Sequence, residues 1–260
     1  MGYTIGVAGK GGTGKTTVAA LIIRYLKKTG RTPILAVDAD PNSNLGDSIG
    51  LPVETSIGTV LDEFLKSKMS LPQGMPKSAY LEVQLNRAII ESESVDLVSM
   101  GRPEGPGCYC YPNELLRKFL DVLSENYPYI VMDNEAGMEH LSRRTTRELD
   151  LLLLVSDPTV KGIRSAGRVK RLAEELDLDI KQIYLVVNRV DGALNPRLAE
   201  EIEKEELELL QTIPEDELLP EYDLEYKPLL ELPESSKAVK AIDELMSKVN
   251  LTEERANVQR

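Results

Sequence analysis

Tryptophan is absent from this 260-residue sequence, and aromatic residues make up only 5% of it. Large rings therefore cannot supply most of the core. Hydrophobic residues still reach 42% of the chain, so leucine, isoleucine, valine and alanine must provide the buried area. The chain is long for one domain, but α/β folds of this size routinely close around a single sheet.

A surplus of positive charge is also missing, because 43 acidic residues outnumber 31 basic ones and leave a net charge of −12. Proteins that bind DNA need basic surfaces for the phosphates, and anionic membranes attract the same charges. The overall balance argues against both, although a local basic patch can exist within an acidic chain. We expect neither nucleic acid nor a membrane as a partner.

Long apolar runs are lacking as well, since no stretch approaches the roughly 18 residues typical of a membrane span. The N-terminus shows none of the charged, apolar and small-residue regions of a signal peptide, and we expect a cytoplasmic protein. Cysteine occurs only at Cys108 and Cys110. In a cytosolic chain this usage favours metal or redox chemistry over a structural disulfide.

The most informative segment runs from Gly9 to Thr17 and reads Gly-Lys-Gly-Gly-Thr-Gly-Lys-Thr-Thr. It follows an apolar run at 3–8 and precedes a helical pattern at 18–23, which is the context that a phosphate-binding G-x-x-x-x-G-K-[ST] loop requires. Its backbone N–H groups and the helix dipole would surround phosphates. Lys15 would meet the β- and γ-phosphates and Thr16 would bind Mg²⁺. The predicted nucleotide contacts are Gly11, Gly12, Thr13, Gly14, Lys15, Thr16 and Thr17.

Apolar runs at 33–37, 95–100, 129–133, 151–156 and 183–188 alternate with helical patterns. This alternation predicts an α/β fold with a doubly wound, mostly parallel sheet flanked by helices. We expect one domain over residues 1–250 and a polar tail at 251–260. Residues 46–94 are predicted to form a helix-and-loop insertion, and a helix at about 235–249 is predicted to pack in the core.

Polar side chains follow three of these runs. Asp38 and Asp40 come after the second strand, Asp133 ends the strand at 129–133, and Asn188 ends the strand at 183–188. In open α/β sheets, ligands bind at the carboxyl ends of the strands. Acids there can position a water molecule or support the hydration of Mg²⁺, and an asparagine offers a donor and an acceptor to a base. The alternative is that Asp40 or Asn42 serves as a helix N-cap.

The two cysteines lie one residue apart, so a disulfide between them would be strained. Thiolates bind cations such as Ni²⁺ and Zn²⁺, but a closed thiolate site usually needs four sulfurs. A two-fold dimer axis through the site would unite two loops into a Cys₄ site. The alternative is a pair of incidental thiols.

The loop Lys-Gly-Gly-Thr-Gly-Lys-Thr-Thr resembles the deviant Walker A motif of the ParA/MinD-type ATPases. In that family the early lysine, here Lys10, reaches the phosphates of the partner in a nucleotide-bound dimer. The resemblance implies that Asp40 orients the attacking water with support from Asp38, which together with Thr16 and Asp133 is also a candidate residue of the Mg²⁺ site. It further implies that Asp133 holds Mg²⁺ and that Gly137 turns its N–H toward the γ-phosphate.

The same resemblance extends to the base end of the nucleotide. It implies that Asn188 contacts adenine and that the segment at 213–216, with Pro214 and Asp216, closes over the base. Guanine is the less favoured alternative, but the sequence leaves it open, because Asp191 lies three residues after Asn188, which is the spacing of guanine sites.

Gly-Cys-Tyr-Cys at 107–110 and Glu-Ala-Gly-Met-Glu-His at 135–140 make the chain similar to the CooC-type accessory ATPases of nickel enzymes. This resemblance implies a homodimer formed with ATP and metal, with nickel held between subunits by Cys108 and Cys110. The client would be carbon monoxide dehydrogenase or acetyl-CoA synthase. His140 is a candidate transient nickel ligand or a structural residue.

Two rival functions belong to the same broad class of ATPase. A ParA/MinD-type positioning ATPase is disfavoured by the acidic charge and by the Cys-x-Cys. An electron-transfer ATPase resembling the nitrogenase iron protein would need a cluster cysteine near the second switch, where this chain has Asp-Asn-Glu-Ala-Gly.

Overall fold

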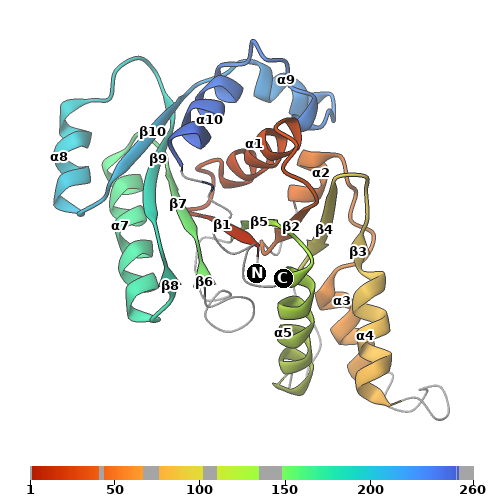
Figure 1. Ribbon diagram of the computed structural model, residues 1–260. Coiled ribbons are helices and arrows are strands. Elements are labelled where there is room, and N and C mark those ends of the chain that lie inside the picture. Colours follow the sequence, from red (N-terminus) through yellow and green to blue (C-terminus); the bar gives the residue numbers. More distant parts are fainter. Residues whose placement is uncertain are drawn as a thin grey trace, which may run out of the picture.

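The computed structural model describes residues 2–40, 44–66, 76–101, 110–134, 148–249 and 251, with the backbone alone at 110–117 and 148. An eight-stranded sheet with the order β10-β9-β7-β1-β5-β2-β4-β3 runs through its centre (Figure 1). Neighbouring strands are parallel, except that β3 is antiparallel to β4. The strands are β1 (Tyr3–Ala8), β2 (Ile34–Asp38), β3 (Ile89–Ile90), β4 (Val95–Ser99), β5 (Tyr129–Asp133), β7 (Leu151–Ser156), β9 (Ile183–Val190) and β10 (Leu209–Pro214). A separate short pair joins β6 (Glu148–Leu149) to β8 (Asp179–Ile180) in parallel.

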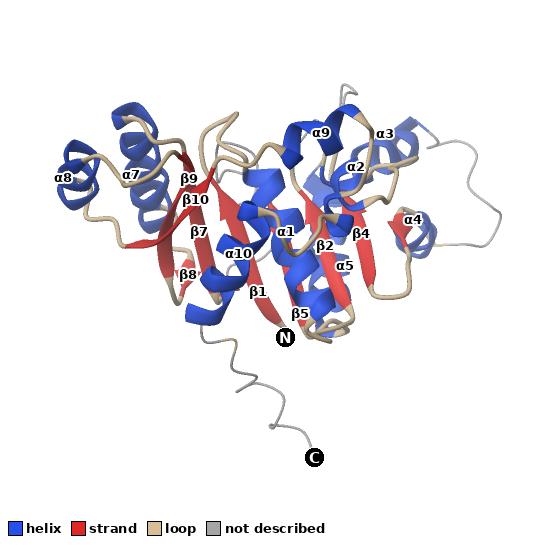
Figure 2. Ribbon diagram, turned by 90° about the horizontal axis from the view of Figure 1, so that it is seen from above, coloured by secondary structure: helices blue, strands red, loops and turns tan. Residues whose placement is uncertain are grey.

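Helices cover both faces of this sheet. In Figure 2, α1 and α10 lie over the strands on the viewer's side. That face carries α1 (Lys15–Lys28), α2 (Leu45–Ile49), α9 (Leu218–Leu224), the 3₁₀ turn η1 (Leu229–Glu231) and α10 (Lys237–Lys248). The opposite face carries α3 (Ile57–Lys66), α4 (Lys77–Arg87), α5 (Cys110–Glu125), α7 (Val160–Glu175) and α8 (Pro196–Lys204). The predicted fold class is confirmed.

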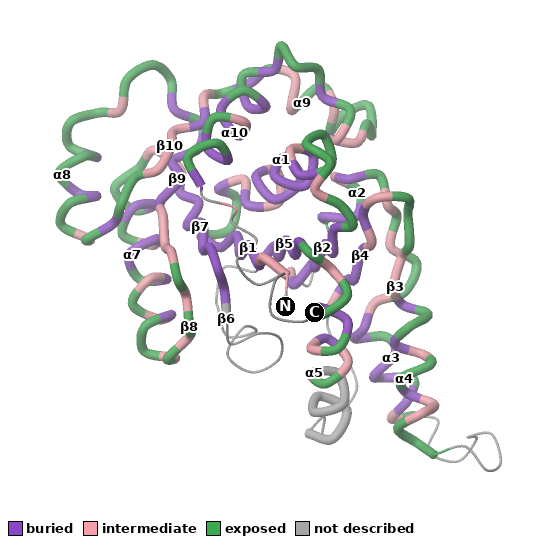
Figure 3. Tube along the Cα trace, in the orientation of Figure 1, coloured by how far each residue is buried: buried purple, intermediate pink, exposed green. Residues whose placement is uncertain are grey.

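The central strands are buried along their whole length (Figure 3), and they are apolar up to the polar residues at their carboxyl ends, because both of their faces are covered. Side chains alternate between the two faces of a strand. In β7, Leu151 and Leu153 pack with the α1 face, whereas Leu152 and Leu154 pack with the α7 face. A continuous apolar run is therefore the pattern of a buried parallel strand.

Two parts of the sheet do not follow the sequence prediction. Strand β10 pairs in parallel with β9 at the edge of the sheet, but its sequence Leu-Leu-Gln-Thr-Ile-Pro lacks the apolar run of a central strand. An edge strand is covered less completely, and proline is tolerated there. The insertion at 46–94 contains α2, α3 and α4, and it also adds the short antiparallel strand β3.

The C-terminal helix α10 packs in the core, as its sequence predicts. Val239, Ile242, Leu245 and Met246 are each at most 1% exposed and join the cluster around α1. Over the residues that the structure describes, no helix combines the length and the apolar character needed to cross a membrane.

Candidate nucleotide-binding site

The loop between β1 and α1 has a backbone path that requires glycine at two positions. Gly9 has φ +150°, and a Cβ there would lie 2.1 Å from the carbonyl oxygen of Val155 in β7. Gly14 has φ +91°, and a Cβ there would lie 2.3 Å from Nδ2 of Asn188 in β9. The loop thus passes between the ends of neighbouring strands at distances that no side chain permits.

Contacts at the Lys10 carbonyl give this loop its shape. That oxygen accepts hydrogen bonds from Oγ1 of Thr13 at 2.9 Å and from Nζ of Lys15 at 3.4 Å. Helix α1 starts directly after the loop, and its N-cap residue Gly14 has no side chain to satisfy the first N–H groups. The first turn of a helix leaves such N–H groups without helical partners, so this end of α1 is suited to binding phosphate.

Thr16 and Asp133 meet at the start of α1. The parallel register places Asp133 opposite Val7, just before the loop, and Thr16 Oγ1 donates to its Oδ2 at 2.5 Å. Oδ1 of Asp133 is buried without a hydrogen-bond partner among the described residues. A hydroxyl beside a carboxylate with an unused oxygen fits the first and second shells of a bound Mg²⁺. Two of the three residues predicted for magnesium, Thr16 and Asp133, therefore lie together.

Asp38 lies on the next strand, opposite Asp133 in the register of β2 and β5. It is fully buried, and its oxygens accept from the backbone N–H groups of Asp40 at 3.1 Å and Leu45 at 2.9 Å. These bonds hold the start of the segment that leads to α2, with Asp40 half-buried at the edge of the site. The three predicted acids thus lie on adjacent strand ends.

Burial raises the pKa of both inner carboxyls. The pKa of Asp38 rises to about 7, mainly through loss of solvation and then through the nearby charge of Asp133, while its two N–H donors oppose the rise. The pKa of Asp133 rises to about 6, again mainly through burial, although Thr16 and Lys15 favour its ionised form. Two carboxyls with raised pKa values beside a phosphate loop are suited to a divalent cation, which would favour their charged forms.

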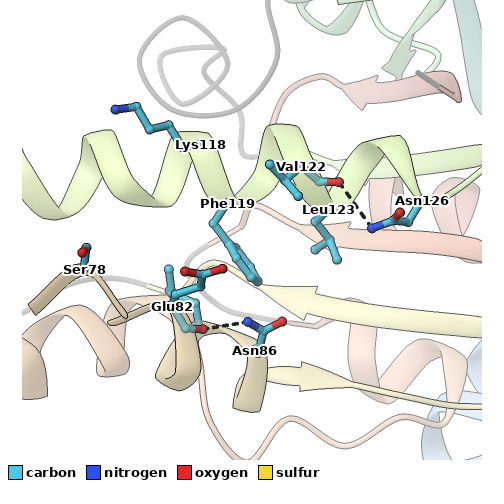
Figure 4. Close-up of a pocket in the computed structure, with 9 residues that line it drawn as sticks. Ser78, Glu82, Asn86, Lys118, Phe119, Val122, Leu123 and Asn126 are labelled. Carbon is cyan, nitrogen blue, oxygen red and sulfur yellow. Dashed lines mark hydrogen bonds between the residues drawn. The ribbon is translucent and has the colours of Figure 1, made fainter. Parts of the chain in front are cut away.

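A cleft of about 730 Å³ opens beside the loop, and its lining includes Thr17, Asn188 and Pro214. Its volume lies within the usual range for small-molecule sites. A separate pocket has Asn86 and Phe119, at α4 and α5, in its lining (Figure 4). The amide of Asn188 donates to the Thr13 carbonyl at 2.9 Å and accepts from the Arg189 N–H at 2.9 Å. Counted over the described residues, these bonds leave one donor and one acceptor for a base edge. Asp191, which a guanine site would use, does not belong to this lining.

Asp216 lines the cleft, but its side chain holds the surrounding elements together. One carboxylate oxygen accepts from Oγ of Ser236 at 2.6 Å and from the N–H of Ala238 at 2.9 Å, and the other accepts from the N–H of Leu218 at 3.1 Å. Burial alone would raise the pKa of Asp216, but these hydrogen bonds outweigh it and lower the pKa. The carboxylate joins the starts of α9 and α10 behind the predicted base loop.

Several predicted residues lie outside the described part of the chain, namely Cys108, Gly137 and His140. Cys110 is the first residue of α5, and its side chain is not described. Among the described residues, no group of three or more His, Cys, Asp or Glu side chains is arranged to hold a metal ion. The thiolate site therefore stays a prediction.

The model of the CobQ/CobB/MinD/ParA nucleotide binding domain matches residues 5–229. The chain belongs to this family. Its relatives include an uncharacterised ATP-binding protein of Methanocaldococcus jannaschii, 40% identical over 94% of this chain and 97% of that protein. The carbon monoxide dehydrogenase accessory protein CooC of Rhodospirillum rubrum is 30% identical over 72% of this chain and 74% of that protein. As a member of this ATP-binding family, the chain is a P-loop ATPase.

Solved structures of the family share the fold. The cell division ATPase MinD of Pyrococcus furiosus superposes with a TM-score of 0.69 at 26% identity, covering 95% of this chain and 98% of that one. MinD of Aquifex aeolicus gives a TM-score of 0.68 at 25% identity, with 95% of each chain covered. The sheet and helices of this ATPase are therefore those of the MinD/ParA structures.

Sequence reasoning missed three contributors to the ATPase site. Arg189 donates from Nη1 to the Gly12 carbonyl at 3.2 Å, and residues of α2 and α9 line the cleft. The one indication in the sequence that Arg189 belongs to the site is its position directly after Asn188. The helices gave no signal, because their sequences contain no motif and only the fold brings them to the loop.

We predict that Gly14→Ala weakens ATP binding by about tenfold or more, because the added methyl meets Asn188 and the backbone stays left-handed. Calorimetric titration of ATP measures this loss. Gly30→Ala is the matched control: Gly30 also has φ +72°, but a Cβ there meets nothing within 4 Å. It should lower stability and leave ATP affinity unchanged. Equal ATP affinities for Gly14→Ala and the wild type would contradict the predicted clash.

A second prediction concerns the pH dependence of stability without metal or nucleotide. The raised pKa values of Asp38 and Asp133 mean that the folded state keeps protons that the unfolded state has released. Their stabilising contribution is full below about pH 4 and disappears as pH rises through about 6 to 7. In Asp133→Asn, the fall in unfolding free energy over this range should be smaller by on the order of 2 kcal/mol. Urea unfolding in EDTA at several pH values tests this, and parallel curves for the two proteins would refute it.

Proposed function

We propose that this ATPase is a dimerising metallochaperone that binds nickel between two subunits and assists its insertion into carbon monoxide dehydrogenase or acetyl-CoA synthase. The observation that carries the proposal is the sequence Cys-x-Cys at 108–110, in a chain that is 30% identical to a carbon monoxide dehydrogenase accessory protein. Zn²⁺ suits the same thiolates. Nickel is cargo in this scheme, whereas ATP and Mg²⁺ serve the phosphate loop.

The proposed ATP chemistry uses side chains that the fold has already assembled. Lys15 is 6% exposed beside the loop and would contact the β- and γ-phosphates. Thr16 and Asp133 would hold Mg²⁺, which neutralises phosphate charge when it is bound. Asp40 would orient the attacking water, and Asp38 would hold Asp40 through the hydrogen bond to its N–H. Asn188 and the segment at Pro214 would contact adenine.

Lys10 would connect ATP binding to dimer formation. Its side chain is exposed, while its carbonyl is held by Thr13 and Lys15 within the loop. The backbone is thus anchored, and the side chain projects from the surface that carries the nucleotide. In a dimer that brings two such loops together, this lysine would reach the partner's phosphates. The same two-fold axis would pair two Cys-x-Cys segments into one four-sulfur site.

A positioning ATPase is the second candidate, because MinD of Thermotoga maritima is 28% identical over 73% of this chain. The acidic chain disfavours it, since DNA and anionic membranes both require basic contacts. Sedimentation with DNA or anionic liposomes, with and without ATP, distinguishes the two candidates. ATP-dependent co-sedimentation would favour the positioning function. An iron–sulfur function would instead require a reducible visible chromophore in the purified protein.

We predict that Cys108→Ser with Cys110→Ser removes about one bound metal ion per dimer. ATP affinity should be unchanged, because neither cysteine is among the predicted nucleotide contacts. Nickel and zinc are measured by mass spectrometry of metals after dialysis, together with the mass of the oligomer. Undiminished metal content in the double variant would refute the thiolate site and leave the ATPase assignment intact.

We also predict that Lys10→Ala weakens ATP-dependent dimerisation, because the partner's phosphates lose a positive charge. Analytical ultracentrifugation with ATP and Mg²⁺ should show a larger monomer fraction than for the wild type. Lys27→Ala is a suitable control, because Lys27 is also exposed but lies in the last turn of α1. If Lys10→Ala and Lys27→Ala sediment alike, Lys10 does not act across the dimer.

A further inference from the structure

Two consecutive residues at the end of β9 hold the phosphate loop by its carbonyl groups. Nδ2 of Asn188 donates to the Thr13 carbonyl at 2.9 Å, and Nη1 of Arg189 donates to the Gly12 carbonyl at 3.2 Å. A hydrogen bond also joins the two residues, since the Arg189 N–H donates to Oδ1 of Asn188 at 2.9 Å. The end of β9 therefore contacts the loop at two adjacent peptide groups.

The orientation of these peptide groups matters for phosphate binding. A phosphate loop works by turning successive N–H groups toward the anion, and the carbonyl of a peptide group points the opposite way from its N–H. Fixing the carbonyls of Gly12 and Thr13 thus fixes the two peptide groups that carry the N–H groups of Thr13 and Gly14. The Thr13 N–H closes the loop by donating to the Lys10 carbonyl at 3.4 Å, so the Gly14 N–H is the one that this arrangement can present to a phosphate. Neither Gly12 nor Gly14 has a side chain to restrict the backbone, and both have positive φ. Such a segment needs external contacts to keep one conformation.

The backbone of Arg189 is itself in an uncommon conformation. Its φ is +59°, in the left-handed region that residues other than glycine rarely adopt. The hydrogen bond from its N–H to the side chain of Asn188 stabilises this turn locally. Strained residues persist where the surrounding contacts determine them. For Arg189 those contacts are its hydrogen bonds to the Gly12 carbonyl and to the side chain of Asn188. Arg189 also lines the cleft.

We propose that Arg189 is a positioning residue that fixes the Gly12 carbonyl. Through its hydrogen bond with Asn188, it also links binding of a base in the cleft to the shape of the phosphate loop. A base that contacts Asn188 would restrict the amide that also holds Thr13 and Arg189. Base binding and phosphate binding would then strengthen each other, and such coupling is reciprocal. The inference rests on nucleotide binding by this ATPase and is independent of the metal-carrying function.

The test uses ADP, which reaches both ends of the site, and pyrophosphate, which reaches only the loop. We expect Arg189→Ala to weaken both ligands about tenfold, the effect of losing one hydrogen bond from a charged donor. Arg189→Lys should restore most of the loss, because its ammonium also donates to a carbonyl. Arg197→Ala is the control, since Arg197 is exposed in the first turn of α8 and lies outside the cleft lining.

Salt dependence separates positioning from direct attraction to phosphate. Loss of a hydrogen bond to a carbonyl should give a similar fold-change at low and high salt, whereas loss of a direct charge contact should shrink at high salt. Urea unfolding is measured in parallel, because a purely structural role lowers stability and leaves ligand affinity unchanged. Unchanged affinity for pyrophosphate, or a loss that vanishes at high salt, would overturn the positioning role.

A double-mutant cycle tests the link through Asn188. ADP affinity is measured for Asn188→Ala, Arg189→Ala and the double variant. The proposal predicts that the double variant loses less affinity than the two single losses combined, because each single change already releases the shared contacts. Independent, additive losses would overturn the coupling. These measurements need no nickel and no dimer, so failure of the metallochaperone proposal would leave their outcome unaffected.

Discussion

The close approach of the phosphate loop to the ends of β7 and β9 is the constraint on which the rest of the site depends. A Cβ on Gly9 would meet the backbone of β7, and a Cβ on Gly14 would meet the amide of Asn188. The loop can follow this path only because both positions are glycine and both strands end at the same sheet edge. Once the loop is held there, Lys15 and Thr16 at the start of α1 are brought to the carboxylate of Asp133. In the proposed function, phosphate binding and cation binding would therefore depend on the same loop geometry.

The same edge of the sheet concentrates negative charge in a buried place. Asp38 and Asp133 lie opposite each other in the register of β2 and β5, and burial raises the pKa of each. Such carboxyls lower stability when they ionise without a counter-charge. Lys15 supplies part of that charge, and a nucleotide-bound Mg²⁺ would supply the rest. These buried carboxyls are thus suited to a ligand that brings its own cation.

An ATPase that moves a metal between proteins must connect nucleotide state to the relation between its subunits. In the proposed function, Lys10 makes this connection, because its backbone belongs to the loop and its exposed side chain can reach a partner. The contacts of Asn188 and Arg189 would act earlier, since they link the base to the loop within one subunit. Cys108 and Cys110 would respond last, when a dimer brings four sulfurs together.

Much of the fold followed from local patterns. The loop motif predicted its own location between a strand and a helix, and continuous apolar runs predicted β1, β2, β4, β5, β7 and β9, because a strand covered on both faces must be apolar throughout. Strand β10 was not predicted, because an edge strand is only partly covered and therefore does not need a continuous apolar run. The neighbouring positions of Asp38 and Asp133 could be read from strand ends, because parallel strands bring their carboxyl ends to one edge. The position of Thr16 followed from the loop motif.

Contacts between distant segments could not be read in this way. The role of Asp216 near the base stays a prediction, and nothing in the sequence indicated that its carboxylate also accepts hydrogen bonds from Leu218 and Ser236 and so joins α9 to α10. Arg189 meets Gly12 across 177 positions of the chain. By itself, the sequence determined the chemistry that is encoded in adjacent residues: the phosphate loop, the acids at strand ends and the cysteine pair. Only the tertiary structure decided which side chains hold that loop, because hydrogen bonds between remote residues depend on where the folded backbone places them.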